Sequence, residues 1–244
     1  MDFTDDAIVL AVRAHGESSA ILEALTREHG RHLGLVRGGA SRRARPVLQP
    51  GNTIHVHWRA RLNEHLGTFT AEPVKARAGD MMESRDALMG LNAFAAVASA
   101  ALPEREVHAP VFEAANLLLD AIQASDFAHW GPLFVRWEAG LLEELGFGLD
   151  LSKCAATGST ENLVYVSPKS GRAVSAAAGA PYKERMFALP DFLLGTQNAE
   201  PELADIAAGL RLTGHFLIER VLTPHGREMP AARLRLDARA GESG

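Results

Sequence analysis

Residues 1–78 show the short apolar runs and two-residue alternation that are typical of β-strands. In the clearest alternation, Ile54, Val56 and Trp58 share one face of a strand, and His55, His57 and Arg59 share the other. Turns containing glycine separate most of the runs. The expected strands cover residues 7–12, 20–26, 32–37, 54–59 and 66–71. Five short strands over this length predict a small antiparallel barrel.

From residue 80 onward the apolar spacing becomes helical. Pro110 and Pro132 are each expected in the first turn of a helix, where a missing N–H costs little. Residues after Arg233 are expected to fray. The segment at about 150–185 has little periodicity and is rich in Gly, Ser and Pro. The expected helices cover residues 81–101, a segment from 110, 132–145 and 201–222.

Together the two patterns predict an α+β chain. Residues 1–78 are expected to form an oligonucleotide-binding (OB-fold) barrel that binds nucleic acid, since barrels of this kind hold strands along one face. Residues 79–244 are expected to form a helical domain, with a small insert at about 150–185.

Composition narrows the class of protein. The 244 residues are 47% hydrophobic and 23% charged, enough to bury a sizeable core. No apolar run reaches the roughly 18 residues of a membrane span. The N-terminus carries acids where a signal peptide needs basic residues, so we expect a cytoplasmic protein. The single cysteine, Cys154, excludes an internal disulfide and a metal site made of cysteines alone.

Charge is unevenly distributed along the chain. The net charge is -5, yet residues 27–61 contain eight arginines against one acid, Glu28, a formal charge of +7. Such a block indicates either a polyanion-binding surface or a solvated one. Trp58 is in phase with the apolar face of its strand, which favours a core position over base stacking. The arginines that we expect to bind phosphates are Arg31, Arg37, Arg42, Arg43, Arg45, Arg59 and Arg61.

Motifs for catalysis are absent from the sequence. It contains no G-x-S-x-G elbow and no G-x-x-x-x-G-K-[ST] phosphate loop. Neither histidine pair, His29 with His32 or His55 with His57, has an accompanying cluster of acids. We therefore expect no enzyme and no cofactor. Two alternatives stay open: a metal-dependent nuclease that uses histidines with Glu64 or Asp80, and an RNA-binding regulatory protein.

Three blocks of the sequence resemble the bacterial RecO family of DNA repair proteins. They are DDAIVLAVRAHGESSAILEALTREHGRHLGLVRGGASRRARPVLQPG, then WEAGLLEELGFGLDLSKCAATG, then YVSPKSGRAV. The resemblance implies binding of single- and double-stranded DNA and annealing of complementary strands. It also implies loading of recombinase, with RecR, onto strands coated by single-strand-binding protein. RecF and the recombinase filament are further implied partners, and no membrane is. The location implied is cytoplasmic and nucleoid-associated.

The resemblance also implies a zinc-finger-like insert, and here the sequence departs from the family. Only one of the four cysteine positions of members with a zinc finger holds a cysteine. We therefore expect a degenerate insert without zinc, held by packing of residues such as Leu163, Tyr165 and Val174. The four positions hold Cys154, Thr157, Ser175 and Ala178.

A second implied site binds the acidic C-terminal tail of single-strand-binding protein. We expect it on the helix 132–145, where Arg136 lies beside apolar residues and could bind a carboxylate bidentately. The alternative is that Arg136 pairs with Glu143 or Glu144 on its own helix. The residues expected to contact the tail are Arg136, Trp137, Leu141 and Leu142.

Overall fold

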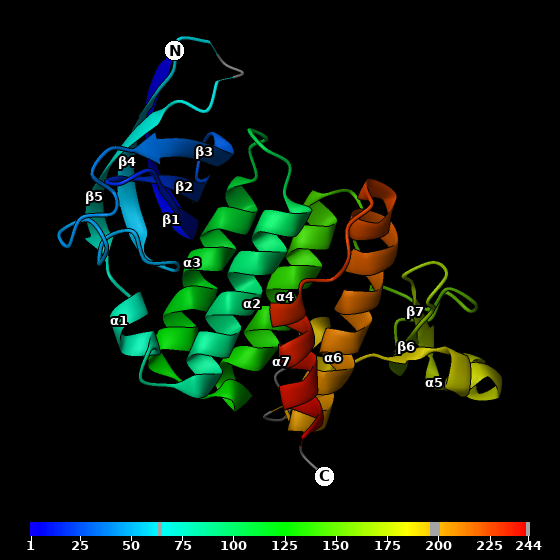
Figure 1. Ribbon diagram of the computed structural model, residues 1–244. Helices are drawn as coiled ribbons and strands as arrows, with labels where there is room; N and C mark the ends of the chain where they lie inside the picture. The colour runs from blue at the N-terminus through cyan, green and yellow to red at the C-terminus, as the bar shows by residue number, and fades with distance from the viewer. Residues whose placement is uncertain (63–64, 196–200, 243–244) are drawn as a thin grey trace. The chain divides into compact units, whose positions relative to one another are not determined.

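The computed structural model describes residues 1–62, 65–195 and 201–242. It divides into two compact units, Met1–Ala124 and Ser125–Gly244. The first contains a five-stranded barrel and three helices, and the second contains helices and a three-stranded sheet (Figure 1). The expected α+β class is therefore confirmed, while the expected domain boundary stays a prediction. Within the described residues, no helix is long and apolar enough to span a membrane.

The barrel closes in the strand order β1-β2-β3-β5-β4, as expected of an OB-fold. All its pairs are antiparallel except β3 with β5. Strand β5 continues through Pro73, beyond the expected end at 71. The proline is tolerated because the register of β5 against β4 shifts there and the end of β5 is exposed. The strands are β1 (Asp2–His15), β2 (Ser19–Thr26), β3 (Gly30–Val36), β4 (Thr53–Arg59) and β5 (Thr68–Lys75).

Alternating apolar side chains of the strands fill the barrel. The Trp58 side chain belongs to this core, as expected, and the residue is only 1% exposed. Its indole nitrogen donates to the carbonyl oxygens of Leu33 at 3.3 Å and Leu66 at 3.2 Å. The buried cluster comprises Ala7, Val9, Leu22, Ala24, Val36, Leu48, Ile54, Val56, Trp58 and Phe69.

The link between β3 and β4, residues 37–52, is called the arginine segment below. It contains helical turns, because Arg45 N–H donates to Ser41 O at 3.1 Å and Leu48 N–H donates to Ala44 O at 3.0 Å. Leu48 is 3% exposed and packs into the barrel core. Gly38 has a φ of 70°, the positive value that glycine adopts without strain. The arginine segment is therefore an anchored part of the barrel.

Arg77 joins the barrel to the helices of the first unit, which are α1 (Ala78–Met81), α2 (Arg85–Ala101) and α3 (Ala109–Ala124). The residue is 2% exposed, and its guanidinium donates to Thr53 Oγ1 at 2.6 Å and to Asp120 Oδ1 at 2.6 Å. It also donates to Gly51 O and Asn116 Oδ1. One side chain thus connects the start of β4 with α3.

The second unit is organised around a buried ion pair. Arg233 and Glu138 are both 0% exposed, and Arg233 Nε donates to Glu138 Oε1 at 2.6 Å. Thr213 Oγ1 donates to the same carboxylate, and Arg233 Nη2 donates to Leu210 O at 2.9 Å. The pair joins the three long helices, because Glu138 lies on α4 (Phe127–Glu144), Thr213 on α6 (Leu203–Phe216) and Arg233 on α7 (Ala231–Gly241).

Two expectations for these helices were wrong. Helix α4 begins at Phe127 because the Asp126 side chain caps it by accepting from His129 N–H, so Pro132 lies inside the helix. The residues after Arg233 do not fray but form α7, which packs against α6 and buries Leu236 completely. Between α6 and α7 the chain continues through a π-helix, Leu217–Leu222, and a short 3₁₀ turn, Thr223–His225.

The segment expected as an insert contains a small sheet of strand order β7-β6-β8. Leu163 and Val174 are buried in it, whereas Tyr165 is half-buried. The packing expected of these three residues is present, although the relation of the segment to a zinc finger stays a prediction. Its elements are β6 (Leu163–Val166), β7 (Ala173–Ser175), α5 (Ala176–Gly179), a 3₁₀ turn (Ala180–Arg185) and β8 (Phe187–Ala188), followed by a 3₁₀ turn (Asp191–Leu194).

We expect Arg233→Met to lower the free energy of unfolding of the second unit by about 3–5 kcal/mol, because it leaves the Glu138 carboxylate buried without its partner. Urea unfolding followed by tryptophan fluorescence measures this, since Trp130 and Trp137 lie in the second unit. Arg235→Met, a change at an exposed position of the same helix, is the control and should cost less than about 0.5 kcal/mol. Equal stabilities of the two variants would contradict the role given to the pair.

Candidate nucleic-acid interface

Four of the expected phosphate-binding arginines lie exposed on the arginine segment. They are Arg37, Arg42, Arg43 and Arg45. Arg45 is partly positioned by its Nε, which donates to Ala40 O at 3.1 Å. The segment itself is held at one end by Ala40 N–H, which donates to Ser18 O. A basic, anchored and exposed surface of this kind can attract a polyanion without first having to order itself.

Arg59 and Arg61 are exposed at the other end of β4. The arginine segment is fixed near Thr53, the first residue of β4, because the Asn52 side chain donates to Pro46 O at 2.8 Å. Arg59 is the last residue of β4, six residues further along, so the two ends are about 20 Å apart. Arg37 starts the arginine segment at the Arg59 end, because the preceding Val36 pairs with Phe69, which pairs with Trp58. The six exposed arginines therefore extend along the barrel from this end of β4 towards the other. An open depression at this end is lined by Met1, Arg59, Ala60, Arg61, His65, Gly67 and Thr68.

Arg31 lies apart from the exposed arginines. Its side chain is 8% exposed, and its Nη1 donates to the buried Glu23 carboxylate at 2.9 Å. Its Nε donates to Leu102 O at 2.9 Å. The guanidinium therefore binds the loop before α3 to the barrel, and we remove Arg31 from the set of phosphate-binding residues. The sequence around Arg31 does not reveal this burial, because the partner Glu23 lies on another strand.

The strand histidines pair with aspartates along the barrel surface. His55 Nδ1 lies 2.7 Å from Asp6 Oδ1, and His57 Nε2 lies 3.6 Å from Asp2 Oδ2. Both pairs are exposed and lie next to each other, because β1 and β4 are paired strands. This part of the barrel surface therefore carries both positive and negative groups. Among the residues that the structure describes, no group of three or more His, Cys, Asp or Glu side chains is arranged to hold a metal ion.

Of the two acids considered for a nuclease site, Asp80 does not join these histidines. Asp80 accepts a hydrogen bond from Gln123 Nε2 on α3, at 2.5 Å. Glu64 lies outside the described residues.

Of the four residues expected to bind a partner in the second unit, only Arg136 is exposed. Arg136 is exposed, and its Nε and Nη2 both donate to Phe192 O, at 3.0 and 2.6 Å. Trp137, Leu141 and Leu142 are 3%, 0% and 0% exposed. These three side chains belong to the core and cannot contact a peptide directly in this conformation.

An open depression adjoins Arg136 and has an apolar lining from segments that follow α4. Sequence periodicity does not reveal this lining, because Leu149 and Leu151 lie outside helices and strands and Leu193 lies in a short 3₁₀ turn. The apolar residues beside Arg136 in this depression are therefore not the ones that were expected. The depression is lined by Arg136, Ala139, Gly140, Glu143, Leu149, Leu151, Phe192, Leu193 and Gly195.

Three of the four positions compared with zinc ligands, Cys154, Thr157 and Ser175, come together, but with different chemistry. Cys154 is 1% exposed, and its Sγ accepts from Ser175 N–H at 3.2 Å. Hydrogen bonds from the side chains of Ser175 and Thr157 lower the pKa of the Cys154 thiol below its usual value. One thiol with two hydroxyls does not fit zinc, which prefers thiolate and imidazole ligands. Hydrogen bonds hold this turn instead.

Comparison with known proteins covers nearly the whole chain. Residues 1–77 match the family model "Recombination protein O N terminal", and residues 82–228 match "Recombination protein O C terminal". The chain is 53% identical over 244 residues to the DNA repair protein RecO of Phenylobacterium zucineum, which covers 100% of this chain and 99% of the relative. It is 52% identical over 233 residues to the DNA repair protein RecO of Sinorhizobium medicae, and the match covers 96% of this chain and 92% of the relative. It is 51% identical over 237 residues to the DNA repair protein RecO of Rhodospirillum centenum, and the match covers 96% of this chain and 93% of the relative.

Elemental analysis of the purified, tag-free protein should find well under one zinc per chain, because Cys154, Thr157 and Ser175 supply a single thiolate. Cys154→Ala should lower the free energy of unfolding by about 1–3 kcal/mol, since Ser175 N–H loses its buried acceptor. Stoichiometric zinc that survives dialysis against a chelator would contradict the assignment of this turn to hydrogen bonding.

Proposed function

Because the chain belongs to the RecO family of DNA repair proteins, we propose that it is a recombination mediator that binds single- and double-stranded DNA and anneals complementary strands. The family's role is DNA repair and recombination. With RecR, the protein would help load recombinase onto strands coated by single-strand-binding protein, with RecF and the recombinase filament as further partners. It acts by binding, without catalysing a covalent step, in the cytoplasm and at the nucleoid.

The observation that carries this proposal is the row of exposed arginines on a barrel of the OB kind. Each guanidinium can neutralise a phosphate and release a condensed counterion, which supplies affinity that does not depend on base sequence. The proposed contacts are Arg37, Arg42, Arg43, Arg45, Arg59 and Arg61. Sequence-independent binding suits a mediator, since damaged DNA presents arbitrary sequences.

Annealing requires that the bases of a bound strand stay free to pair. The buried Trp58 cannot stack on successive bases, and four of the six exposed side chains of the arginine segment are cations. Contacts of this kind hold the phosphate backbone and leave base edges exposed, because a guanidinium on a phosphate makes no contact with the base. Reduced repulsion between two backbones then favours duplex formation.

The depression beside Arg136 is the proposed site for the tail of single-strand-binding protein. Two donors of the Arg136 guanidinium are used by Phe192 O, which fixes its orientation, while the residue stays exposed. Leu149, Leu151 and Leu193 offer an apolar surface for an aromatic side chain at the end of the tail. A fixed guanidinium next to an apolar surface suits a peptide that ends in an aromatic residue and a carboxylate.

Changing Arg42, Arg43 and Arg45 together to alanine should weaken single-strand binding and flatten its salt dependence. If about five phosphates are contacted, the slope of log K against log salt should change from roughly -3.5 to about -1.4, at -0.7 per contact. Fluorescence anisotropy with labelled DNA measures the slope. The control removes three exposed cations elsewhere: Arg85, Lys153 and Arg235.

The same proteins are tested for annealing of complementary strands in Mg²⁺. Wild type should anneal without cleaving, and the arginine triple variant should anneal more slowly. An unchanged slope and annealing rate in that variant would remove the arginine segment from the DNA surface. Cleavage of DNA would instead favour a nuclease.

Arg136→Ala should weaken a labelled peptide with the tail sequence of single-strand-binding protein about tenfold or more, because the carboxylate loses a charge-assisted hydrogen bond. DNA affinity should not change. Lys153→Ala removes an exposed cation elsewhere in the second unit and should leave peptide affinity as in wild type. Equal peptide affinity of wild type and Arg136→Ala would remove Arg136 from the tail site and leave it only contacts within the protein, such as those with Phe192 O or with Glu143 or Glu144.

A further inference from the structure

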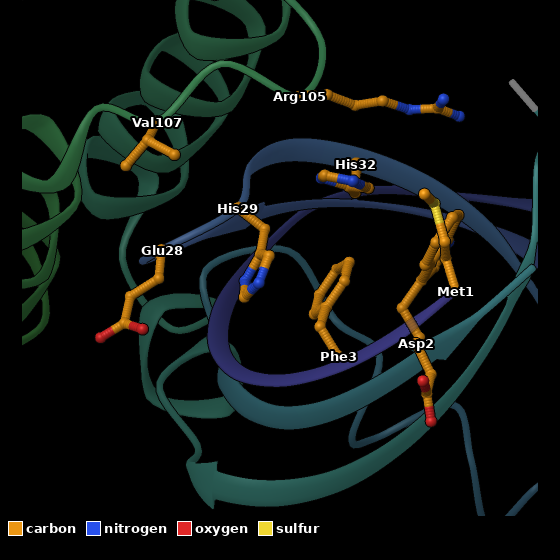
Figure 2. Close-up of a pocket in the computed structure, with 9 residues that line it drawn as sticks. Met1, Asp2, Phe3, Glu28, His29, His32, Arg105 and Val107 are labelled. Atoms are coloured by element: carbon orange, nitrogen blue, oxygen red, sulfur yellow. The ribbon is translucent and has the colours of Figure 1, made fainter. Parts of the chain in front are cut away.

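A pocket of about 340 Å³ opens on the barrel close to the N-terminus, and its walls are mainly aromatic. Figure 2 shows the rings of Phe3, His29 and His32 gathered below the Arg105 side chain, with Met1 on one side and Val107 on the other. The size is at the lower end of pockets that hold small organic ligands. The lining residues are Met1, Asp2, Phe3, Glu28, His29, His32, Trp58, Arg105 and Val107.

The rings form an ordered stack. Phe3 lies parallel to His29, with ring centroids 3.9 Å apart and planes at 5°, and its centroid is 5.3 Å from that of Trp58. His32 meets both Phe3 and Trp58 edge-on. Burial lowers the pKa of His32 to about 4, so this ring is neutral at pH 7. The Phe3, Trp58 and His32 rings thus form an uncharged aromatic part of the inner wall, which suits a planar π-system, while His29 Nδ1 lies 2.9 Å from the buried Asp5 carboxylate.

The outer wall is a rigid loop that holds a cation above the rings. The Arg105 guanidinium lies 5.9 Å from the centroid of the Trp58 ring and donates to His65 O at 3.0 Å. Arg105 has a φ of 63°, a left-handed conformation that few residues other than glycine adopt. It is held there by its own N–H, which donates to Arg31 O at 2.9 Å. Backbone strain of this kind is retained where the surrounding structure fixes it, often at ligand sites.

The aromatic pocket differs in charge from the depression that contains Arg59 and Arg61. Asp2 and Glu28 are exposed at the aromatic pocket and would repel a phosphate, but carboxylates can accept hydrogen bonds from the amino group of a base. The neighbouring depression contains Arg59 and Arg61, which suit a phosphate. The two hollows share Met1, so a base and its own backbone could occupy both.

We propose that this aromatic pocket receives one unpaired base of a bound single strand while Arg59 and Arg61 hold the adjoining phosphates. The inference rests on the proposed DNA-binding function and adds a base-holding subsite to it. Holding a single base anchors the strand without covering the others, so annealing can proceed along the rest. A duplex presents no unpaired base, and therefore the pocket distinguishes single from double strands.

The test compares a phosphate–sugar strand that lacks all bases with the same strand carrying one adenine, a base with an amino group, at its centre. Wild type should bind the one-base strand about tenfold more tightly, as one stacked base does elsewhere. Arg105→Asn removes the guanidinium but keeps a residue that tolerates positive φ, and Val107→Trp fills the pocket from an exposed position. Both variants should reduce the gain from the base to less than twofold, whereas Arg85→Asn, at an exposed position on α2, should keep it.

Salt dependence separates this inference from the proposed function. The slope of log K against log salt for the baseless strand should be equal in wild type, Arg105→Asn and Val107→Trp, which shows that backbone binding persists. Equal affinity of wild type for the two strands, with a normal slope, would overturn the base pocket alone. A gain that survives in both variants would also overturn it. Absence of salt-dependent binding to either strand would overturn DNA binding itself.

Discussion

The first unit depends on the buried guanidinium of Arg77. It hydrogen-bonds to Thr53 at the start of β4 and to Asp120 and Asn116 on α3. Its backbone N–H donates to Asn52 Oδ1 at 2.8 Å, and Asn52 in turn fixes the end of the arginine segment through Pro46 O. Partial burial alone would raise the pKa of Asp120, but hydrogen bonds from Lys75 and Arg77 lower it overall, so the acceptor stays charged. The residue therefore secures both the barrel and the surface that we propose for DNA.

Burial separates the arginines of this chain by role. Arg31, Arg77 and Arg233 are each less than a tenth exposed and pair with Glu23, Asp120 and Glu138. A buried guanidinium needs such a carboxylate, because the cost of removing the charge from water is otherwise not offset. Six of the exposed arginines, on the arginine segment and at the end of β4, lie in solvent where a phosphate can reach them. A formal charge of +7 in the sequence window thus overstates the basic surface, since the Arg31 charge is already neutralised.

Local pattern was enough to predict the barrel. Its alternation fixed five strands and the core position of Trp58, because each strand buries one face and exposes the other. Local pattern failed where a distant partner decides the outcome. Helix α7 depends on Arg233 meeting Glu138, 95 residues away, and nothing in the tail sequence shows that contact. The preference of proline for the first turn places the start of α4 at Pro132, whereas the Asp126 cap starts the helix at Phe127.

The candidate sites were predictable to different degrees. Charge counting predicts a basic surface, but it does not reveal that Arg31 is buried against Glu23. The apolar lining beside Arg136 and the aromatic pocket combine residues from separate segments, such as Phe3, Trp58 and Arg105, that only the folded chain brings together. Sequence reasoning assigned the tail site to Trp137, Leu141 and Leu142 because an amphipathic stripe does not reveal whether a helix faces a core or a partner.

The central claim is that the exposed arginines hold the DNA backbone while the buried ones hold the fold. Chemical modification of arginine by phenylglyoxal, read residue by residue by mass spectrometry with and without single-stranded DNA, tests it most directly. The account predicts that DNA protects Arg37, Arg42, Arg43, Arg45, Arg59 and Arg61, while Arg31 and Arg77 stay unmodified in both states. Equal modification of the six exposed arginines with and without saturating DNA would contradict it.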